Sequence, residues 1–505
     1  MRKVLIANRG EIAVRIIHAC RELGLGSVAV YSEVDRDALH VRLADEAVAI
    51  GPADPRESYL HVGRLIDAAR ATGADAIHPG YGFLAESAAF ASAVGEAGLL
   101  FVGPPADVIA RLGDKVEARR LMERVGIPVV PGYHETDASD DALTRAGARI
   151  GAPLLVKAAG GGGGRGMRRV DRLDDLPASL AAARREAQAA FGTSALYLER
   201  YLPDVRHIEM QVLADRHGTI WQLGERECSV QRRHQKIIEE APSAFVTAEL
   251  RAQLRDAAAA AAAAVGYVNA GSVEFLVDEA GRLFFLEVNT RLQVEHPVTE
   301  MATGVDLVKA QLRIAAGERL QGQPAETRGH AIECRVYAED PAHEFAPSAG
   351  RILALDEPRG PGIRVDSGLR LGWRVPVAYD PLLAKVIAWG QSREEAIDRI
   401  AEALRRYVIL GVRTNLAFLQ DAVREAAFRQ GKTTTQFVER HLAGWRPTFP
   451  EEARAIAACV ATWAEEHAEI ARPRTIGAGA GEARSRRPAD PWATIGRWRM
   501  GNPDA

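Results

Sequence analysis

Residues 284–295 read FFLEVNTRLQVE, and from Glu287 onward every second residue is polar. These polar residues are Glu287, Asn289, Arg291, Gln293 and Glu295. In an extended chain, a period of two places all five side chains on one face and the apolar residues on the other. A solvated strand face would also alternate, but it would carry interchangeable surface residues, often Lys, Thr and Ser. Carboxylates, amides and a guanidinium in one row therefore favour a functional site over the polar outer face of a hairpin.

A β-hairpin is predicted to contain the start of this row. Residues 272–277 and 283–289 read as strands that flank Asp278-Glu279-Ala280-Gly281, a favourable turn sequence. Pairing of residue 274 with residue 287 or 285 would place Glu274 and Glu287 on one face. Two carboxylates held that close repel each other unless a cation lies between them. Because carboxylate and amide oxygens suit Mg²⁺ or Mn²⁺, the hairpin predicts a metal site that nucleotide phosphates would complete.

The composition is that of an ordinary soluble globular protein. The chain has 505 residues, 47% hydrophobic and 26% charged, which predicts two to four domains. Its formal net charge of −3 gives no electrostatic reason to expect nucleic-acid binding, so anionic ligands would need local groups of Lys, Arg and Gly. Cys20, Cys228, Cys334 and Cys459 are far apart and predict reduced thiols in a cytoplasmic protein. The N-terminus does not read as a signal peptide, and no apolar run reaches membrane-spanning length, so no membrane association is expected.

The residue pattern divides the chain into four parts. Residues 1–115 predict an open, mostly parallel α/β domain, because short apolar strands alternate with helices. Residues 116–202 predict a smaller unit with a glycine-rich loop, residues 203–446 a mixed α+β region, and residues 447–505 a helical and flexible tail. Residues 8–11, NRGE, do not form a GxGxxG motif, so a dinucleotide-binding domain is not favoured. The expected strands include 4–7, 27–31, 99–102, 154–157 and 196–199, and the expected helices include 179–190 and 451–471.

The glycine-rich loop, residues 157–167, reads KAAGGGGGRGM and follows an apolar strand directly. A run of glycines lets backbone N–H groups approach an anion without obstruction by Cβ atoms, and Lys157 supplies a nearby point charge. The GxxxxGK[ST] pattern of a Walker A motif is absent. We expect a mobile phosphate cover that closes when nucleotide binds, with a flexible linker as the alternative. Residues 225–236, ERECSVQRRHQK, add a second segment dense in charged and hydrogen-bonding groups.

These and other segments together resemble the biotin carboxylases, which are ATP-grasp ligases. The matching strings run in order across residues 1 to about 445, and they are IANRGEIAVRI, HPGYGFLAE, GDK, KAAGGGGGRGM, RHIEMQV, ERECSVQRRHQK, EVNTRLQVEHPVTE and GHAIECR. The resemblance implies an ATP-grasp fold of the α/β and α+β classes. It implies an N-terminal open parallel α/β domain, a mobile lid over ATP, and a C-terminal domain with a mixed sheet.

The resemblance also implies roles for individual residues. For ATP it implies Lys115, Lys157, Gly161, Gly162, Gly163, Gly164, Gly166, Glu199, Leu202, His207, Gln231 and His234. For the magnesium or manganese ions it implies Glu274, Glu287 and Asn289. For bicarbonate and biotin it implies Lys236, Arg291, Gln293, Val294, Glu295 and Arg335. The catalytic residues among them would be Lys236, Arg291, Glu295 as the base that deprotonates bicarbonate, and Arg335 as the partner of the biotin ureido oxygen.

The chemistry of these side chains agrees with such a reaction. Attack of bicarbonate on the γ-phosphoryl group of ATP requires cations that neutralise phosphate charge and a base that removes a proton. The resulting carboxyphosphate would break to CO₂ and phosphate, and biotin N1 would capture the CO₂. Two alternatives are another ATP-grasp ligase, such as a carbamoyl phosphate synthase half or an amino-acid ligase, and a non-enzymatic ATP-responsive subunit. The QVEHP sequence with the ECR segment around Arg335 weighs against the first, and intact Lys236, Arg291 and Glu295 weigh against the second.

The expected partners follow from what the sequence lacks. No Met-Lys-Met biotin-attachment motif occurs, so we expect biotin to arrive on a separate biotin carboxyl carrier protein and the carboxyl group to pass to a separate carboxyltransferase. The assembly would be an acetyl-CoA or other acyl-CoA carboxylase, and the family implies a homodimer. Residues 491–492 and 498–499 resemble the start of the connector in long α-subunits of acyl-CoA carboxylases. A disordered or partner-docking tail is the alternative interpretation of this segment.

Overall fold

A computed structural model describes residues 1–135, 138–159, 167–324 and 326–448, together with residues 455, 459 and 462. The chain forms two compact units, residues 1–447 and residues 448–505. The predicted phosphate cover, with Gly161, Gly162, Gly163, Gly164 and Gly166, lies outside the described residues, as do the tail sequences at 491–499 and most of the predicted helix at 451–471. Within the described ranges, none of the helices combines the length and hydropathy that crossing a bilayer requires.

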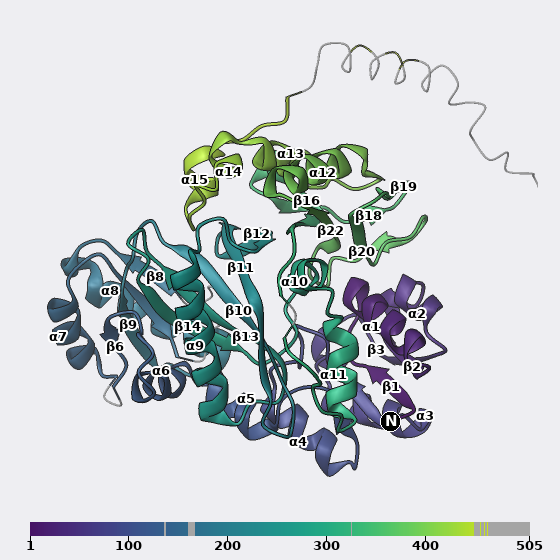
Figure 1. The fold of residues 1–505 in the computed structure, drawn as a ribbon, viewed down its shortest axis with the longest axis horizontal. Coiled ribbons are helices and arrows are strands. Elements are labelled where there is room, and N and C mark those ends of the chain that lie inside the picture. The colour runs from purple at the N-terminus through teal and green to yellow at the C-terminus, as the bar shows by residue number, and fades with distance from the viewer. Residues whose placement is uncertain are drawn as a thin grey trace, which may run out of the picture. The chain divides into compact units, whose positions relative to one another are not determined.

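The N-terminal part contains a parallel sheet with the strand order β3-β2-β1-β4-β5 (Figure 1). Helix α1 buries Ile12, Ile16 and Ile17 because these residues recur at helical spacing on one face. The predicted open parallel α/β domain is confirmed. Strand β3, half of whose residues are exposed, is a strand that the sequence pattern did not predict. The elements are β1 (Lys3–Ile6), α1 (Gly10–Glu22), β2 (Gly26–Ser32), α2 (Leu39–Leu43), β3 (Glu46–Gly51), α3 (Val62–Thr72), β4 (Ala76–His78), α4 (Ala88–Glu96) and β5 (Leu100–Phe101).

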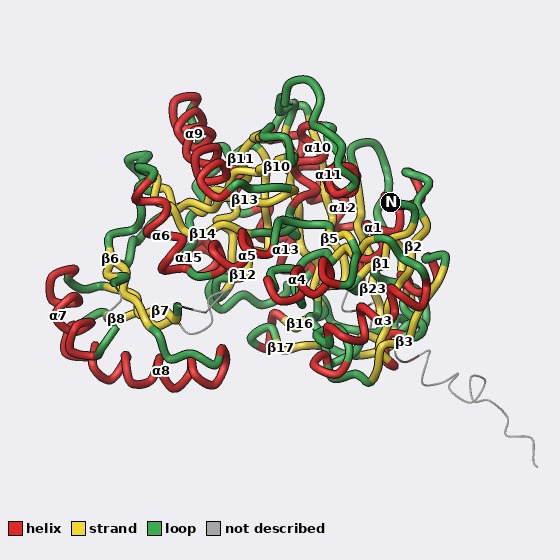
Figure 2. Tube along the Cα trace, turned by 90° about the horizontal axis from the view of Figure 1, so that it is seen from below, coloured by secondary structure: helices red, strands yellow, loops and turns green. Residues whose placement is uncertain are grey.

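A second, smaller sheet has the strand order β6-β9-β7-β8 and is antiparallel. Two helices, α7 and α8, pack on it through a separate apolar core that includes Leu143, Val156, Leu180 and Leu198 (Figure 2). Two further helices, α5 and α6, connect this sheet to the N-terminal part. The elements are α5 (Ala106–Gly113), α6 (Lys115–Arg124), β6 (Gly132–Tyr133), α7 (Asp140–Ile150), β7 (Leu154–Ala158), β8 (Met167–Val170), α8 (Leu176–Phe191) and β9 (Leu196–Arg200).

The largest sheet of the described residues is antiparallel, with the strand order β14-β13-β10-β11-β12-β15-β22-β20. It therefore extends without a break from the predicted hairpin, β13 and β14, to β22 and β20. Helix α9 packs against β10, β11 and β13 (Figure 1). The elements are β10 (Arg206–Ala214), β11 (Ile220–Arg232), β12 (Gln235–Ala241), α9 (Ala248–Val265), β13 (Asn269–Val277), β14 (Leu283–Asn289), α10 (His296–Thr303), α11 (Leu307–Ala315), β15 (His330–Tyr337), β20 (Ile363–Ser367) and β22 (Leu382–Gly390).

Alternation along β10 explains how this sheet separates a core from a polar face. Ile208, Met210 and Val212 pack with α9 in one apolar cluster, while His207 and Glu209 point to the opposite face. The same holds for β13, whose Val273 and Phe275 enter this core and whose Glu274 does not. The polar face is the one that carries the site described below.

The C-terminal part packs helices on β15 and β22 through a core that includes Ile332, Val386, Ile397 and Phe418. The remaining strands form three two-stranded sheets among the described residues, β16-β17, β18-β21 and β19-β23. The elements are β16 (Glu339–Asp340), β17 (Ala346–Pro347), β18 (Gly350–Arg351), β19 (Ala354–Asp356), β21 (Arg374–Val375), α12 (Arg393–Arg406), β23 (Val408–Leu410), α13 (Leu416–Arg424), α14 (Ala426–Arg429) and α15 (Phe437–His441).

Candidate active site

One cavity of about 660 Å³ brings the predicted site residues together. Its walls come from the second sheet, the β13–β14 hairpin, and strands β10, β11, β12 and β15. Every predicted site residue that the structure describes lines this cavity: Lys115, Lys157, Glu199, Leu202, His207, Gln231, His234, Lys236, Glu274, Glu287, Asn289, Arg291, Gln293, Val294, Glu295 and Arg335.

The row of polar residues is not one extended strand. Strand β14 ends at Asn289, residues 290–295 leave the sheet, and α10 begins at His296. The predicted strand at residues 283–289 is therefore confirmed, and the extended arrangement considered for the whole row ends at Asn289. The loop turns before the helix, where the His296 N–H donates to the Gln293 carbonyl at 3.3 Å. The five polar side chains still reach one cavity, so their grouping comes from this loop rather than from a strand face.

The hairpin register places Glu274 opposite Glu287, which is one of the two predicted pairings. The predicted turn is also present, because the Gly281 N–H donates to the Asp278 carbonyl at 3.0 Å and Gly281 has a φ of 76°. The register shifts after Glu274. The next residue, Phe275, faces the opposite side of the sheet and enters the core. The local sequence therefore fixes which carboxylates face each other.

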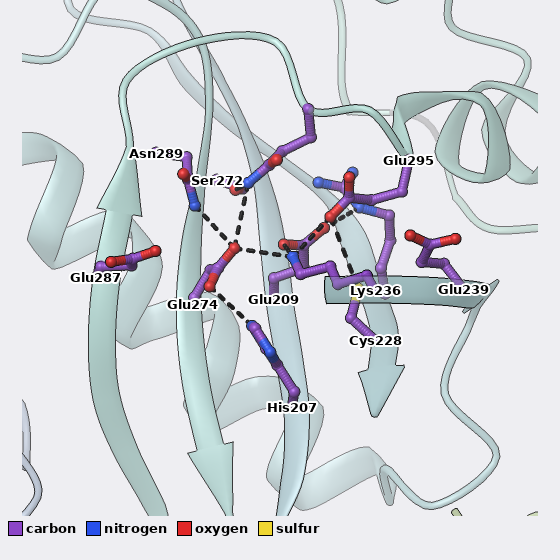
Figure 3. Close-up of polar contacts among 12 residues, drawn as sticks. His207, Glu209, Cys228, Lys236, Glu239, Ser272, Glu274, Glu287, Asn289 and Glu295 are labelled. Carbon is purple, nitrogen blue, oxygen red and sulfur yellow. Dashed lines mark hydrogen bonds and ion pairs between the residues drawn. The ribbon is translucent and has the colours of Figure 1, made fainter. Parts of the chain in front are cut away.

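Glu274 accepts hydrogen bonds on both carboxylate oxygens (Figure 3). Its Oε1 lies 2.9 Å from Lys236 Nζ, 2.8 Å from Asn289 Nδ2 and 3.2 Å from Gln293 Nε2. Its Oε2 lies 2.8 Å from His207 Nε2. Burial alone would raise the pKa of Glu274, but Lys236 and His207 outweigh burial and hold this pKa well below its usual value. Glu274 is therefore a carboxylate at neutral pH.

Glu295 is held between two cations. Lys236 Nζ lies 2.6 Å from Glu295 Oε1, and Arg335 Nη2 lies 2.9 Å from Glu295 Oε2. Lys236 also contacts Glu209 at 2.8 Å, and Arg335 also pairs with Glu239. Burial would raise the pKa of Glu295, but Lys236 and Arg335 lower it far below its usual value. The buried side chain is thus an ionised proton acceptor whose affinity for a proton depends on these two contacts.

The facing carboxylates of the hairpin fit a divalent cation. Glu287 Oε2 accepts a hydrogen bond from Lys115 Nζ at 2.6 Å, as Glu274 does from Lys236. Each carboxylate is therefore paired with a lysine, and the positive charge offsets the repulsion between the two carboxylates. Carboxylate oxygens, with the amide oxygen of Asn289, are the donors that Mg²⁺ or Mn²⁺ prefers.

Arg291 connects the loop to the N-terminal part. Its Nε donates to Glu86 Oε2 at 2.9 Å, its Nη1 to Gln293 Oε1 at 3.0 Å, and its Nη2 to Asn289 Oδ1 at 3.1 Å. Burial disfavours the charged form, but Glu86 outweighs burial and raises the pKa of Arg291. The guanidinium is therefore charged, and a guanidinium can bind an anion through two parallel N–H groups.

Glu199 lies in the part of the cavity lined by the second sheet. Its carboxylate is almost fully buried, lies 2.5 Å from Lys157 Nζ, and also pairs with Arg119. Burial would raise the pKa of Glu199, but Lys157 and Arg119 outweigh burial and lower it. Arg119 also donates to the Val130 carbonyl at 3.1 Å, so this residue of α6 contacts both Glu199 on β9 and the segment before β6.

Several functional neighbours were not predicted from the sequence. Glu209 contacts Lys236 and pairs with Glu274 in the β10–β13 register. Its carboxylate, the His207 ring and the Glu274 carboxylate offer ligand atoms within 4.8 Å of one another. The alternation in RHIEMQV places Glu209 on the face of His207, so this pattern could have revealed it. Glu239 is different, because only the β12–β15 pairing brings it to Arg335.

Comparison with known proteins agrees with the fold. Residues 1–109 match the model of the biotin carboxylase N-terminal domain, residues 114–323 that of the carbamoyl-phosphate synthase L chain ATP binding domain, and residues 333–440 that of the biotin carboxylase C-terminal domain. A biotin carboxylase of Pseudomonas aeruginosa is 50% identical over 445 residues, which are 88% of this chain and 99% of that protein. The similarity therefore extends over nearly the whole of that relative.

Solved structures extend the agreement to three dimensions. The biotin carboxylase domain dimer of Hydrogenobacter thermophilus 2-oxoglutarate carboxylase, in complex with MgADP, ADP and bicarbonate, matches with a TM-score of 0.86 at 46% identity. The match covers 89% of this chain and 99% of that one. A structure of the biotin carboxylase part of a pyruvate carboxylase matches with a TM-score of 0.76 at 47% identity, over 89% of this chain and 100% of that one.

The fold and the site together define a class of enzyme. A parallel α/β part, a small sheet with its helices, and a large sheet with facing carboxylates and lysines define an ATP-grasp ligase. Within that class, the chain belongs to the biotin carboxylase family.

Proposed function

We propose that this protein carboxylates biotin on a separate carrier protein, using ATP and bicarbonate and releasing ADP and phosphate. The observation that carries the proposal is the position of Glu295, whose two carboxylate oxygens lie 2.6 Å from Lys236 and 2.9 Å from Arg335. A base held between two cations, beside a pair of facing carboxylates, suits a reaction in which two anions must meet.

The nucleotide would lie along the lysine-rich part of the cavity. Lys115 and Lys157 would contact phosphate oxygens, and Glu199 and Leu202 would contact the adenine. His207, Gln231 and His234 would line the nucleotide site, and all seven residues line the cavity. Gly161, Gly162, Gly163, Gly164 and Gly166 would cover the phosphates. Mg²⁺ or Mn²⁺ bound by Glu274, Glu287 and Asn289 would neutralise charge on the phosphates. Residues 116–202 would form the lid, between the N-terminal domain of residues 1–115 and residues 203–446.

In the first step, the protein would orient bicarbonate and remove its proton. Arg291 would pair with two bicarbonate oxygens, while Lys236, Gln293 and the Val294 backbone contact the rest of the anion. When Lys236 turns toward bicarbonate, Glu295 loses part of the charge that lowers its pKa and becomes a stronger base. The deprotonated bicarbonate oxygen would then attack the γ-phosphorus, which forms carboxyphosphate and releases ADP.

In the second step, carboxyphosphate would break to CO₂ and phosphate. The phosphate accepts the proton from biotin N1, and N1 forms the new bond to the carbon of CO₂. Arg335 would donate to the ureido oxygen, where negative charge develops as N1 loses its proton. A guanidinium suits this position because its charge is delocalised and always present.

The partners belong to the proposal as well. The carboxylated biotin would travel on a biotin carboxyl carrier protein to a separate carboxyltransferase, within an acetyl-CoA or other acyl-CoA carboxylase. A homodimer in the cytoplasm is the proposed form of the protein. Solved structures similar to this chain belong to carboxylases named for different acceptors, 2-oxoglutarate and pyruvate. The biotin carboxylase fold therefore does not by itself determine the acceptor.

The test uses the purified chain with MgATP, free biotin and ¹⁴C-bicarbonate. We expect acid-labile ¹⁴C on biotin, with ADP formed in equal amount, and loss of both in Glu295→Gln. A bicarbonate-dependent ATP cleavage that ignores biotin and yields no carboxybiotin would contradict the proposal. Formation of carbamoyl phosphate when ammonia is added would point to the other ATP-grasp ligase considered above.

A further inference from the structure

Lys385, on β22, is a buried lysine that the proposed reaction does not use. Its side chain is fully buried, and its Nζ donates to the carbonyl oxygen of Val294 at 2.7 Å. The nearest carboxylates are farther away, with Glu11 Oε2 at 3.4 Å and Asp366 Oδ2 at 3.9 Å. The shortest polar contact of this ammonium is therefore a neutral backbone oxygen in the 290–295 loop.

The neighbouring carboxylates do not fully neutralise Lys385. Asp366 is already engaged by Arg364, with contacts of 2.7 and 2.8 Å to its two oxygens. Burial raises the pKa of Glu11 to about 7, even though Lys385 acts to lower it, so this carboxyl is partly protonated near neutral pH. A buried ammonium without a full counterion is costly, whereas an apolar side chain of similar length would fill the same space. The hydrogen bond from Lys385 to the Val294 carbonyl gives a reason for a lysine, rather than an apolar residue, at this position.

Lys385 and Arg335 contact neighbouring groups of the 290–295 loop. The two residues are direct partners in the β15–β22 register. Arg335 contacts the Glu295 carboxylate, and Lys385 contacts the carbonyl of the residue before it. Because the peptide group is planar and trans, fixing the Val294 carbonyl also fixes the Glu295 N–H in the opposite direction, away from Lys385.

We propose that Lys385 is a positioning residue that fixes the Val294–Glu295 peptide, so that the Glu295 carboxylate and the Val294 backbone meet bicarbonate in one orientation. Lys385 acts through the backbone and does not line the cavity that holds the other site residues. The inference rests on the proposed function, because it assigns Lys385 to the bicarbonate end of that site.

Kinetics with three variants test the inference. Lys385→Met keeps the length of the side chain and removes the donor, while Lys385→Arg keeps a charged donor. We expect Lys385→Met to raise KM for bicarbonate about tenfold or more and to change KM for ATP less than about twofold, with partial recovery in Lys385→Arg. Glu11→Gln is the matched control, because it changes the other neighbour of Lys385 and leaves the Val294 contact, so both KM values should stay near those of the wild type.

Hydrogen–deuterium exchange supplies a readout that does not depend on activity. Amides of residues 290–296 should exchange faster in Lys385→Met than in the wild type, while α9 and the parallel sheet remain unchanged. If the wild type cleaves no ATP with bicarbonate, the proposed function fails, but the exchange of this loop still decides whether Lys385 fixes it.

Several outcomes would overturn the inference. One is a folded Lys385→Met protein with unchanged exchange and an unchanged KM for bicarbonate. Another is an equal loss toward ATP and bicarbonate with faster exchange throughout the chain, which would mark a purely structural role. If Lys385→Met does not fold, Lys385→Gln, whose shorter side chain leaves its amide out of reach of Val294, takes its place. Failure of both to fold would also overturn the inference.

Discussion

Glu11 on α1 offers a test of the buried electrostatics through the pH dependence of stability. Its side chain is 2% exposed, both of its oxygens lack a hydrogen-bond partner among the described residues, and burial raises its pKa from 4.5 to about 7. The folded protein thus binds this proton more tightly than the unfolded chain. Stability is lost as the pH rises from about 4.5 to about 7, and the loss is complete above that range. A shift of this size corresponds to about 3 kcal/mol at pH 8.

The variant Glu11→Gln removes this titration while keeping the shape of the protonated acid. With an unfolding entropy of ~2.1 cal/mol/K per residue over the 447 residues of the first unit, about 3 kcal/mol corresponds to a Tm shift of roughly 3–4 °C. We expect the Tm of Glu11→Gln to exceed that of the wild type by this amount at pH 8 and by only about a quarter of it at pH 5. Differential scanning calorimetry at both pH values, with the exposed Glu279→Gln as control, measures the difference. An equal Tm difference at both pH values, or a lower Tm of Glu11→Gln at pH 8, would show that burial does not raise the pKa of Glu11.

Three further variants separate the parts of the site. Glu287→Gln removes one of the facing carboxylates and the 2.6 Å partner of Lys115, so the Mg²⁺ concentration for half-maximal turnover should rise about tenfold or more in a metal titration. An unchanged metal requirement would exclude Glu287 as a ligand. Arg119→Met removes a buried cation beside Glu199 and should raise KM for ATP several-fold while KM for bicarbonate stays the same. A raised KM for bicarbonate with an unchanged KM for ATP would show that the nucleotide does not bind beside Glu199. Leu254→Ala, at a fully buried position of α9, should lower the free energy of unfolding by about 2–5 kcal/mol in denaturant titrations without changing either KM. A change in either KM would show that packing of the α9 core affects substrate binding.

The sequence predicted the local features of the site well. The turn at residues 278–281 and the alternation on each side of it determine the register that places Glu274 opposite Glu287. Both depend on a few neighbouring residues, so pattern and turn chemistry suffice. The predicted strand at residues 283–289 matches β14, although the polar alternation continues past Asn289 to Glu295. β14 is the edge of its sheet, and the chain leaves that edge to enter α10, which the period of two does not reveal.

The contacts that set the charge of the site could not be predicted in this way. Arg335 and Lys385 act on Glu295 and Val294 from strands that lie 40 and 91 residues further along the chain. Neither spacing nor composition indicates that β15 and β22 would lie side by side with these two residues in register. Such pairing depends on the packing of the whole sheet. The role predicted for Arg335 therefore rested on its chemical type and on the family resemblance.

In the proposed reaction, bicarbonate that Glu295 has deprotonated attacks the γ-phosphorus of ATP. Turnover with bicarbonate labelled with ¹⁸O, followed by mass analysis of the inorganic phosphate, tests this attack. We expect one ¹⁸O atom in each phosphate formed by the wild type with biotin present, because the attacking oxygen remains on phosphorus when carboxyphosphate breaks. Phosphate without label, under conditions in which carboxybiotin forms, would exclude attack by bicarbonate.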